Sequence, residues 1–341
     1  MLGTLEGHHT TPEAPDFQKA LSRIHSQGNE WACVEVSSHG LDYGRVEGTE
    51  FAGAVFTNLS VEHLDFHQDM ETYFLAKRRL FERSTGLAVV AVVDLWGERL
   101  ANELKTSQHQ ELVVVKPNMV ENPVLDVEAS TFEWRGLKIR TPLLGLFNMF
   151  NLVVVGETLK GFGIDDEVVA GGLETVKPVK GRMEPVVVPG SDLAVIVDYS
   201  HKPEALAQAL NAVRSFSAGR VWLVFGAGGN RDSAKRPLMG QIASELADEI
   251  IVTSDNPRSE EPSEIAAEIV SGIKIETAKS KVLLDRADAI HFAVNRAQSG
   301  DSILIAGKGH EIYQEIGNEQ RPFDDVKVAK EALLERVRTS L

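Results

Sequence analysis

The sequence predicts an α/β protein with two domains, each built on a largely parallel sheet. Short runs such as Arg220–Phe225, Glu249–Thr253 and Ser302–Ala306 are apolar almost throughout. Continuous rather than alternating apolar runs are typical of parallel strands that are covered on both faces. Amphipathic stretches such as Pro203–Phe216 separate most of these runs. The 341 residues exceed what one hydrophobic core usually organises, so two domains are expected.

The strands follow from the positions of the apolar runs. In chain order they are expected at Trp31–Val36, Ala52–Phe56, Leu87–Val93, Leu112–Val115, Leu193–Val197, Arg220–Phe225, Glu249–Thr253 and Ser302–Ala306. Between Val124 and Leu144 the pattern alternates and lacks long helices, which indicates an antiparallel excursion. Proline and glycine break the pattern at Val176–Arg182, where we place the interdomain linker.

Helices are expected where apolar residues repeat at helical spacing. One helix opens with Asp69 as its N-cap, and its apolar stripe ends at Phe81. Others are expected at Pro203–Phe216, Leu238–Leu246 and Asp325–Val337.

Charge and composition limit the function classes. The net charge of −15 argues against a nucleic-acid or anionic-membrane partner. Cys33, the single cysteine, lies in an apolar run, which predicts a buried thiol and not a nucleophile. No run approaches membrane-spanning length, and Met1–Thr4 shows no signal peptide. We therefore expect a cytoplasmic protein. We also expect a monomer, which does not follow from these observations.

Two charged residues of the first domain lie in apolar surroundings. Glu35 is the one charge on the predicted strand Trp31–Val36, where a carboxylate is costly unless it meets a cation or a metal. Lys77 lies in the apolar stripe of its helix. The ordinary interpretation is a lysine that snorkels to the surface. The alternative is an amine with a lowered pKa, which can react with carbon dioxide to form a carbamate ligand for Mg²⁺.

The second domain has an unusual turn at Asp255–Arg258, directly after a predicted buried strand. An acid, an amide and a guanidinium are held there by Pro257, at the edge of the sheet where open α/β folds bind ligands. These groups suit a ligand with both ammonium and carboxylate groups. The ordinary alternative is a strand-to-helix turn with an N-cap.

Several separate motifs, in order along nearly the whole chain, resemble those of the Mur ligases. They are Thr10–Pro15, Glu35–His39, Phe56–Leu59, His63–His67, Tyr73–Lys77, Gly145–Asn151, Asp198–Pro203, Phe225–Asp232, Asp255–Arg258 and Gly307–Glu311. The resemblance implies a central parallel-sheet domain of the ATPase type over residues 1–181, truncated at its N-terminus. It implies a Rossmann-like α/β C-terminal domain over residues 182–341, which binds the amino acid.

The resemblance also implies roles for individual residues. Lys77 would be carbamylated and would hold Mg²⁺ with Glu35 and His63, close to the γ-phosphate of ATP. The other implied sites are Thr10, Thr11, Ser37 and Arg45 for the UDP-muramoyl-dipeptide, Asn148, Arg182 and Asp198 for ATP, and Arg231, Asp255, Asn256, Arg258, Gly307 and Glu311 for meso-diaminopimelate.

The activity implied is ATP-dependent amide-bond formation through an acyl phosphate. It would add meso-diaminopimelate to UDP-N-acetylmuramoyl-L-alanyl-D-glutamate in peptidoglycan biosynthesis. The family's P-loop, Gly-x-x-Gly-Lys-Thr-[ST], does not occur ahead of Thr10, so we expect a truncated gene or a fragment. The alternatives are a non-catalytic amino-acid-binding remnant, inactive without the P-loop, and a related amide ligase such as a folylpolyglutamate synthetase.

Overall fold

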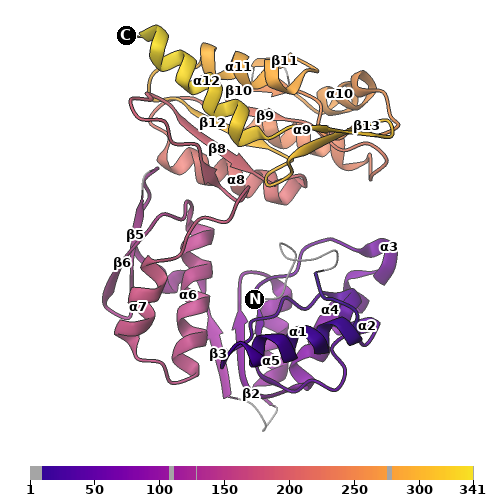
Figure 1. Ribbon diagram of the computed structural model, residues 1–341, viewed down its shortest axis with the longest axis vertical. Coiled ribbons are helices and arrows are strands. Elements are labelled where there is room, and N and C mark those ends of the chain that lie inside the picture. The colour runs from indigo at the N-terminus through magenta and orange to yellow at the C-terminus, as the bar shows by residue number, and fades with distance from the viewer. Residues whose placement is uncertain (1–9, 107–110, 128, 275–278, 341) are drawn as a thin grey trace. The chain divides into compact units, whose positions relative to one another are not determined.

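The computed structural model describes residues 10–106, 111–127, 129–274 and 279–340. Contacts divide the chain into two compact units. The first holds the described residues up to Glu121 together with Phe150–Gly171, and the second holds Asn122–Met149 together with the described residues from Gly172 onward. Figure 1 follows the chain from indigo at the N-terminus to yellow at the C-terminus.

The first unit contains a parallel three-stranded sheet in the order β1-β2-β3. Its core joins the sheet to two helices, through Phe74 of α4 and Leu100 of α5. Asp69 and Asp94 cap these helices by accepting hydrogen bonds from Thr72 N and Gly97 N. In order, the elements are α1 (Ala14–Ser26), α2 (Ser38–Asp42), β1 (Phe51–Phe56), α3 (Leu64–His67), α4 (Met70–Glu82), β2 (Ser84–Ala91), α5 (Leu95–Leu104) and β3 (Glu111–Val115).

One predicted strand of this unit is wrong. Residues 31–36 form no strand, and Val34 alone makes an isolated bridge. Cys33 is exposed, not buried, and Glu35 is exposed as well. The physical reason is that an apolar run becomes a buried strand only when neighbouring strands pair with it and helices cover it. The sheet formed by the described residues ends at β1, so this run stays outside it.

The predicted antiparallel excursion is confirmed. After a 3₁₀ turn (Pro117–Met119), the three strands β4 (Glu121–Val124), β5 (Ser130–Trp134) and β6 (Leu137–Thr141) form one sheet, in which β5 and β6 are antiparallel. The connection Arg135–Gly136 has positive φ at both residues, as a two-residue hairpin turn requires. The helices α6 (Leu146–Gly161) and α7 (Asp166–Glu174) follow.

The second unit is organised by a six-stranded sheet in the order β11-β10-β9-β12-β8-β7. All printed pairings are parallel except that of β7 with β8. The elements are β7 (Glu184–Pro185), β8 (Ala194–Asp198), α8 (Pro203–Phe216), β9 (Val221–Phe225), α9 (Lys235–Leu246), β10 (Glu249–Val252), α10 (Pro262–Ser271), β11 (Lys279–Val282), α11 (Arg286–Arg296), β12 (Ser302–Ala306), β13 (Tyr313–Ile316), β14 (Glu319–Pro322) and α12 (Asp325–Ser340).

Helices cover both faces of this sheet, so the predicted α/β architecture is confirmed (Figure 1). One core packs α8, α9 and α10 against one face, and a second core packs α11 and α12 against the other. The carboxyl ends of the parallel strands therefore meet at one edge, where the turns after β8, β9, β10 and β12 lie. The expected boundary between residues 181 and 182 stays a prediction.

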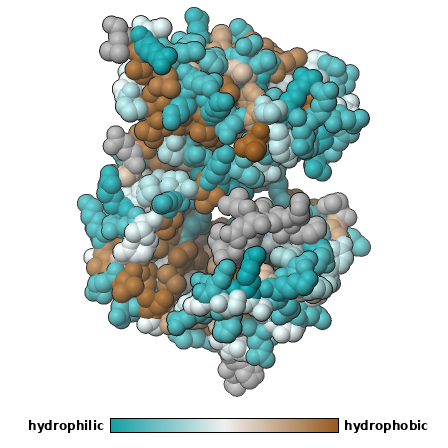
Figure 2. Space-filling view, viewed as in Figure 1, coloured by the Kyte–Doolittle hydropathy of each residue, from teal (hydrophilic) through white to brown (hydrophobic). Residues whose placement is uncertain are grey.

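Hydrophilic residues predominate on the face shown in Figure 2. Large apolar side chains such as Leu95 and Val187 are exposed at 65% and 72%, but such residues are normal on protein surfaces. Within the described ranges, no helix has the length and apolar character needed to cross a membrane.

Candidate functional site

The turn after β10 carries a buried acid with one unused oxygen. Asp255 is 8% exposed, and its Oδ1 accepts a hydrogen bond from Asn256 N at 2.8 Å. Its Oδ2 is buried without a hydrogen-bond partner among the described residues. Gly307, the first residue after β12, has a φ of 117°, and a Cβ there would lie 2.5 Å from this oxygen, so both the backbone and the space favour glycine. Because an unpaired buried oxygen is costly, this carboxylate is suited to a donor supplied by a ligand.

A network of three side chains joins the ends of β10 and β12. Lys308 is fully buried, and its Nζ donates to Asn256 Oδ1 at 2.9 Å and to Glu311 Oε2 at 3.0 Å. Asn256 Nδ2 donates to the same Glu311 oxygen at 2.8 Å. Sequence reasoning did not select Lys308 as a site residue. The available signal was a lysine between two glycines directly after an apolar strand.

Two arginines flank the glycine-rich turn after β9. Arg258 Nη1 donates to Gly229 O at 2.8 Å, and its Nε lies 2.7 Å from Glu315 Oε2. A Cβ on Gly228 would lie 3.1 Å from Arg258 Nη1 and 3.7 Å from Arg231 Cγ. The structure thus gathers the six residues selected for amino-acid binding at the ends of three adjacent strands.

Of the residues selected for ATP, Asp198 ends β8, Arg182 lies just before β7 and Asn148 lies in the first turn of α6. Asp198 Oδ2 accepts from Met183 N at 2.7 Å, and Oδ1 accepts from the backbone and the hydroxyl of Ser200. A carboxylate has about four acceptor sites, so one remains open to a further donor among the contacts of the described residues. The Arg182 guanidinium lies 4.8 Å from the centre of the Tyr199 ring. Asn148 Nδ2 donates to Leu144 O at 2.8 Å.

Three of the residues selected for the UDP-linked substrate lie together in the first unit. Thr11 is fully buried and its hydroxyl donates to Glu35 O at 3.0 Å. The same hydroxyl accepts from Ser37 N at 2.8 Å. Arg45 Nη1 donates to Thr11 O at 3.1 Å, and Arg45 Nη2 lies 2.6 Å from Glu13 Oε1. Thr10 precedes this cluster in the chain.

Lys77 lies beside acidic residues in a partly buried position. Its Nζ donates to Val36 O at 3.1 Å. Burial lowers the pKa of Lys77, and the carboxylates of Glu35 and Glu62 oppose that shift. Sequence reasoning did not select Glu62, whose Oε1 lies 3.6 Å from His63 Nε2. Within the described ranges, no set of three His, Cys, Asp or Glu residues could hold a metal, so a metal site here would need Lys77 as well.

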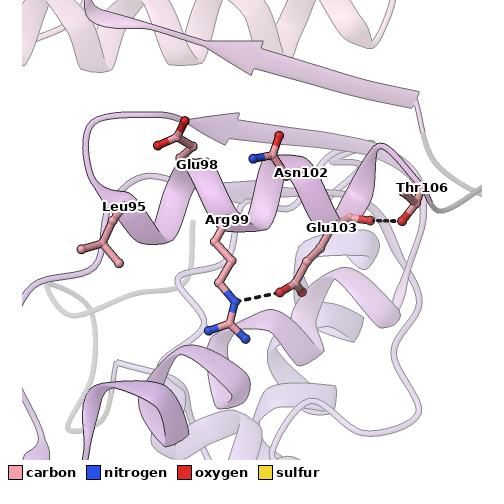
Figure 3. Close-up of a pocket in the computed structure, with 6 residues that line it drawn as sticks. All are labelled: Leu95, Glu98, Arg99, Asn102, Glu103 and Thr106. Atoms are coloured by element: carbon pink, nitrogen blue, oxygen red, sulfur yellow. Dashed lines mark hydrogen bonds and ion pairs between the residues drawn. The ribbon is translucent and has the colours of Figure 1, made fainter.

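A hollow of about 560 Å³ lies along α5, away from these residues. Figure 3 shows the Arg99 side chain directed toward the Glu103 carboxylate, with Nε 2.8 Å from Oε1. Glu71 also binds Arg99, with its Oε2 2.5 Å from Nη1. The arginine charge is therefore already balanced, and none of the residues selected from the sequence lines this hollow.

Two family models, both of Mur ligase domains, match the chain. Residues 1–158 match the family model of the Mur ligase middle domain, and residues 181–309 match that of the Mur ligase glutamate ligase domain. The chain belongs to the Mur ligase family.

The names of similar proteins point to one particular ligase within the family. A UDP-N-acetylmuramoyl-L-alanyl-D-glutamate–2,6-diaminopimelate ligase of Synechocystis sp. is 43% identical over 96% of this chain and 67% of the relative. The protein of the same name from Gloeobacter violaceus is 45% identical over 97% and 69%. The chain therefore spans about two thirds of the length of these relatives.

Comparison with solved structures finds a ligase of the same name and more distant proteins with the same fold. One with that same ligase name is 33% identical, with a TM-score of 0.68 over 98% of this chain and 71% of its own. A folylpolyglutamate synthase from Thermotoga maritima, 16% identical with a TM-score of 0.54 over 75% of this chain and 57% of its own, shares the fold alone.

Proposed function

We propose that this chain catalyses ATP-dependent addition of meso-diaminopimelate to UDP-N-acetylmuramoyl-L-alanyl-D-glutamate, in the cytoplasm, as a step of peptidoglycan biosynthesis. The observation that carries this proposal is the cluster at the ends of β9, β10 and β12. There, the acids Asp255 and Glu311 lie on the same edge as Arg258 and Arg231. Such an edge matches an amino acid with two ammonium and two carboxylate groups. The relatives' names agree with this assignment.

Each residue of this cluster has a proposed task. Arg258 and Arg231 bind the carboxylates of diaminopimelate, and Glu311 binds an ammonium group. The unused Oδ2 of Asp255 accepts a further N–H from the ligand. Held in this way, the free amine attacks the acyl carbon of the phosphorylated D-glutamate, the C–N bond forms and phosphate leaves. Catalysis then depends mainly on positioning.

The nucleotide and metal requirements rest on other residues. Asn148, Arg182 and Asp198 are proposed to hold ATP, and Thr10, Thr11, Ser37 and Arg45 the UDP-linked dipeptide. Glu35, His63 and a carbamate on Lys77 are proposed to hold Mg²⁺, because they offer the oxygen-rich ligand set that this ion prefers. When bound, Mg²⁺ neutralises charge on the phosphates during phosphoryl transfer.

Calorimetric titration of the purified chain with meso-diaminopimelate and, separately, with L-lysine tests the substrate. We expect selective binding of diaminopimelate, and Arg258→Ala should abolish it because the second carboxylate loses its partner. Arg321→Ala is the matched control, since that arginine pairs with the exposed Glu319 on β14. Equal affinity for both amino acids would contradict the assignment. No binding at all would support the ordinary strand-to-helix turn.

A separate measurement tests the carbamate. The chain is equilibrated with ¹³C-bicarbonate at mildly alkaline pH, and its ¹³C NMR spectrum is recorded. A carbamate carbon resonance that Lys77→Arg removes would support the proposal, because an arginine cannot form this adduct. Lys330→Arg, at an exposed position of α12, controls for surface lysines. A spectrum identical for the chain and for Lys77→Arg would contradict the role of Lys77.

A further inference from the structure

The β13–β14 hairpin is fastened to the turn that carries Arg258. Arg258 N donates to Glu315 O at 3.0 Å, and Gly317 N donates to Arg258 O at 2.7 Å. Glu315 N donates to Asn256 Oδ1 at 3.0 Å, and Gln314 Nε2 donates to Asp255 O at 2.9 Å. None of these bonds uses the Glu315 side chain. The hairpin should therefore stay in place when that side chain is replaced.

The Glu315 carboxylate contacts one defined edge of the Arg258 guanidinium. Its Oε2 lies 2.7 Å from Nε, while Nη1 donates to Gly229 O at 2.8 Å. Nη2 makes no hydrogen bond to the part of the chain that the structure describes. A guanidinium is planar and rigid, so two fixed nitrogens set the direction of the third. With Glu315 at Nε and Gly229 O at Nη1, Nη2 is the guanidinium nitrogen that is left for an incoming oxyanion, through its N–H that points away from Nε.

The Arg258–Glu315 ion pair affects the orientation of the guanidinium more than it affects the stability of the fold. The Arg258 and Glu315 side chains are 26% and 27% exposed, and ion pairs with this much solvent contact contribute little to folding. Glu315 also has a second contact, since Gln320 Nε2 lies 3.4 Å from its Oε1. Each Glu315 oxygen thus has a neighbouring donor group, Arg258 for Oε2 and the exposed Gln320 amide for Oε1.

We infer that Glu315 is a positioning residue that gives this site its selectivity for an amino acid with a second carboxylate. The inference rests on the proposed function. By holding Nε, Glu315 keeps Nη2 of Arg258 directed toward that carboxylate. L-Lysine lacks the second carboxylate and gains nothing from this orientation. The residue therefore acts on discrimination between ligands and not on amino-acid binding in general.

Titration of the intact chain with meso-diaminopimelate and L-lysine tests the inference in Glu315→Ala and Glu315→Gln. We expect about tenfold weaker diaminopimelate binding for Glu315→Ala, the effect of losing one oriented ion pair, with lysine binding unchanged. Glu315→Gln should fall between, because its amide oxygen keeps the shape of the contact with Nε and loses the charge. Glu319→Ala, on β14 of the same hairpin, should match the parent chain.

Three results would overturn the inference. Tighter diaminopimelate binding by Glu315→Gln would mean that the carboxylate competes with the ligand. Equal losses for both amino acids would indicate general distortion. Unchanged binding in every Glu315 variant would remove its role.

A parent chain that binds no diaminopimelate would instead refute the proposed function. The orientation is then tested without ligand through the Arg258 Nε–H resonance in ¹⁵N NMR. Glu315→Ala should shift it, and an unmoved resonance would overturn the pairing.

Discussion

Lys308 is fully buried, and its charge is paired with polar groups of the amino-acid site. Its ammonium satisfies Asn256 Oδ1 and Glu311 Oε2 at once. Replacing it with an apolar side chain would remove one of the two donors that each oxygen has, leaving Glu315 N for Asn256 Oδ1 and Asn256 Nδ2 for Glu311 Oε2. At the residue scale, therefore, the amino-acid site depends on a side chain that does not itself have to contact the ligand.

Lys308→Met should lower the free energy of unfolding by about 1–3 kcal/mol, because Glu311 is partly exposed and water can replace part of the lost contact. Urea unfolding followed by circular dichroism measures this change. Lys330→Met, at an exposed position of α12, should stay within about 0.5 kcal/mol. Similar values for both variants would show that the Lys308 network is not formed in solution.

His201 predicts a dependence of stability on pH. Burial lowers its pKa below the ordinary value of about 6.5, and its Nδ1 donates to Tyr199 O at 2.8 Å. At pH values between the lowered pKa of folded His201 and its ordinary pKa, the unfolded chain binds more protons than the folded chain. The free energy of unfolding therefore falls as the pH drops below about 6.5. Burial lowers the pKa of His67 too, and adds a slope of the same sign.

Thermal unfolding of the chain and of His201→Gln between about pH 5 and 8 tests this expectation. The variant should lose part of the pH slope and keep the part due to His67. A slope that is the same in both proteins would mean that His201 titrates normally in the folded state.

At the scale of elements, a buried ion pair joins α11, the start of α12 and the end of β12. Arg286 Nε and Nη2 lie 2.7 and 2.8 Å from the two oxygens of Asp325, and both side chains are fully buried. Nη2 also donates to Ala306 O at 3.0 Å, the last residue of β12. The pair thus anchors the strand end from which Gly307–Glu311 leaves the sheet.

Asp325→Asn should destabilise the second unit by about 3–5 kcal/mol, because it leaves a buried guanidinium uncompensated. Arg286→Met combined with Asp325→Leu should recover much of that loss, since no buried charge remains. Chemical unfolding measures both. A double variant as unstable as Asp325→Asn would indicate that the hydrogen bonds of Arg286 to the strand matter more than its charge.

Gly181 and Gly317 have similar left-handed backbone conformations but different surroundings. Alanine substitutions at the two positions therefore distinguish the cost of the backbone conformation from the cost of a steric clash. Gly181 and Gly317 have φ of 67° and 59°. A Cβ on Gly181 would lie 2.0 Å from His310 N, whereas a Cβ on Gly317 meets nothing within 4 Å. Gly317→Ala should therefore lower the free energy of unfolding by about 1–2 kcal/mol, the cost of placing a non-glycine residue in the left-handed conformation. Gly181→Ala should cost clearly more and disturb the turn at Gly309. Equal losses in urea unfolding would exclude the close contact.

At the scale of the whole molecule, the two compact units have separate cores. Leu100 is fully buried in the core of the first unit and Leu210 in a core of the second. Units with their own cores can unfold separately, so a single unfolding free energy would not describe the chain.

Differential scanning calorimetry should show two transitions. Leu100→Ala and Leu210→Ala should each lower a different one, since emptying a buried leucine position costs about 2–5 kcal/mol within its own core. Hydrogen exchange assigns each transition to its unit. One transition that both variants lower equally would show that the two cores unfold together.

The sequence alone determined the α/β class, most strands, and the motifs that place the chain in its family. Those features depend on local patterns: apolar runs, helical spacing, and glycine or proline at turns. It also selected Asp255, Asn256 and Arg258, because residues after a parallel strand lie at the ligand-binding edge of the sheet, and it selected Gly307 and Glu311 through the resemblance to the family.

Tertiary structure alone decided which side chains touch. Trp31–Val36 looked like a buried strand, yet it lacks strand partners in the described structure and leaves Cys33 exposed. Lys308 and Glu315 lie 52 and 59 residues beyond Asn256, whose side chain each contacts through Nζ and backbone N. A local sequence pattern cannot predict these contacts with Asn256. They depend on the order of the strands and on the position of the β13–β14 hairpin, which are set only when the whole sheet has formed.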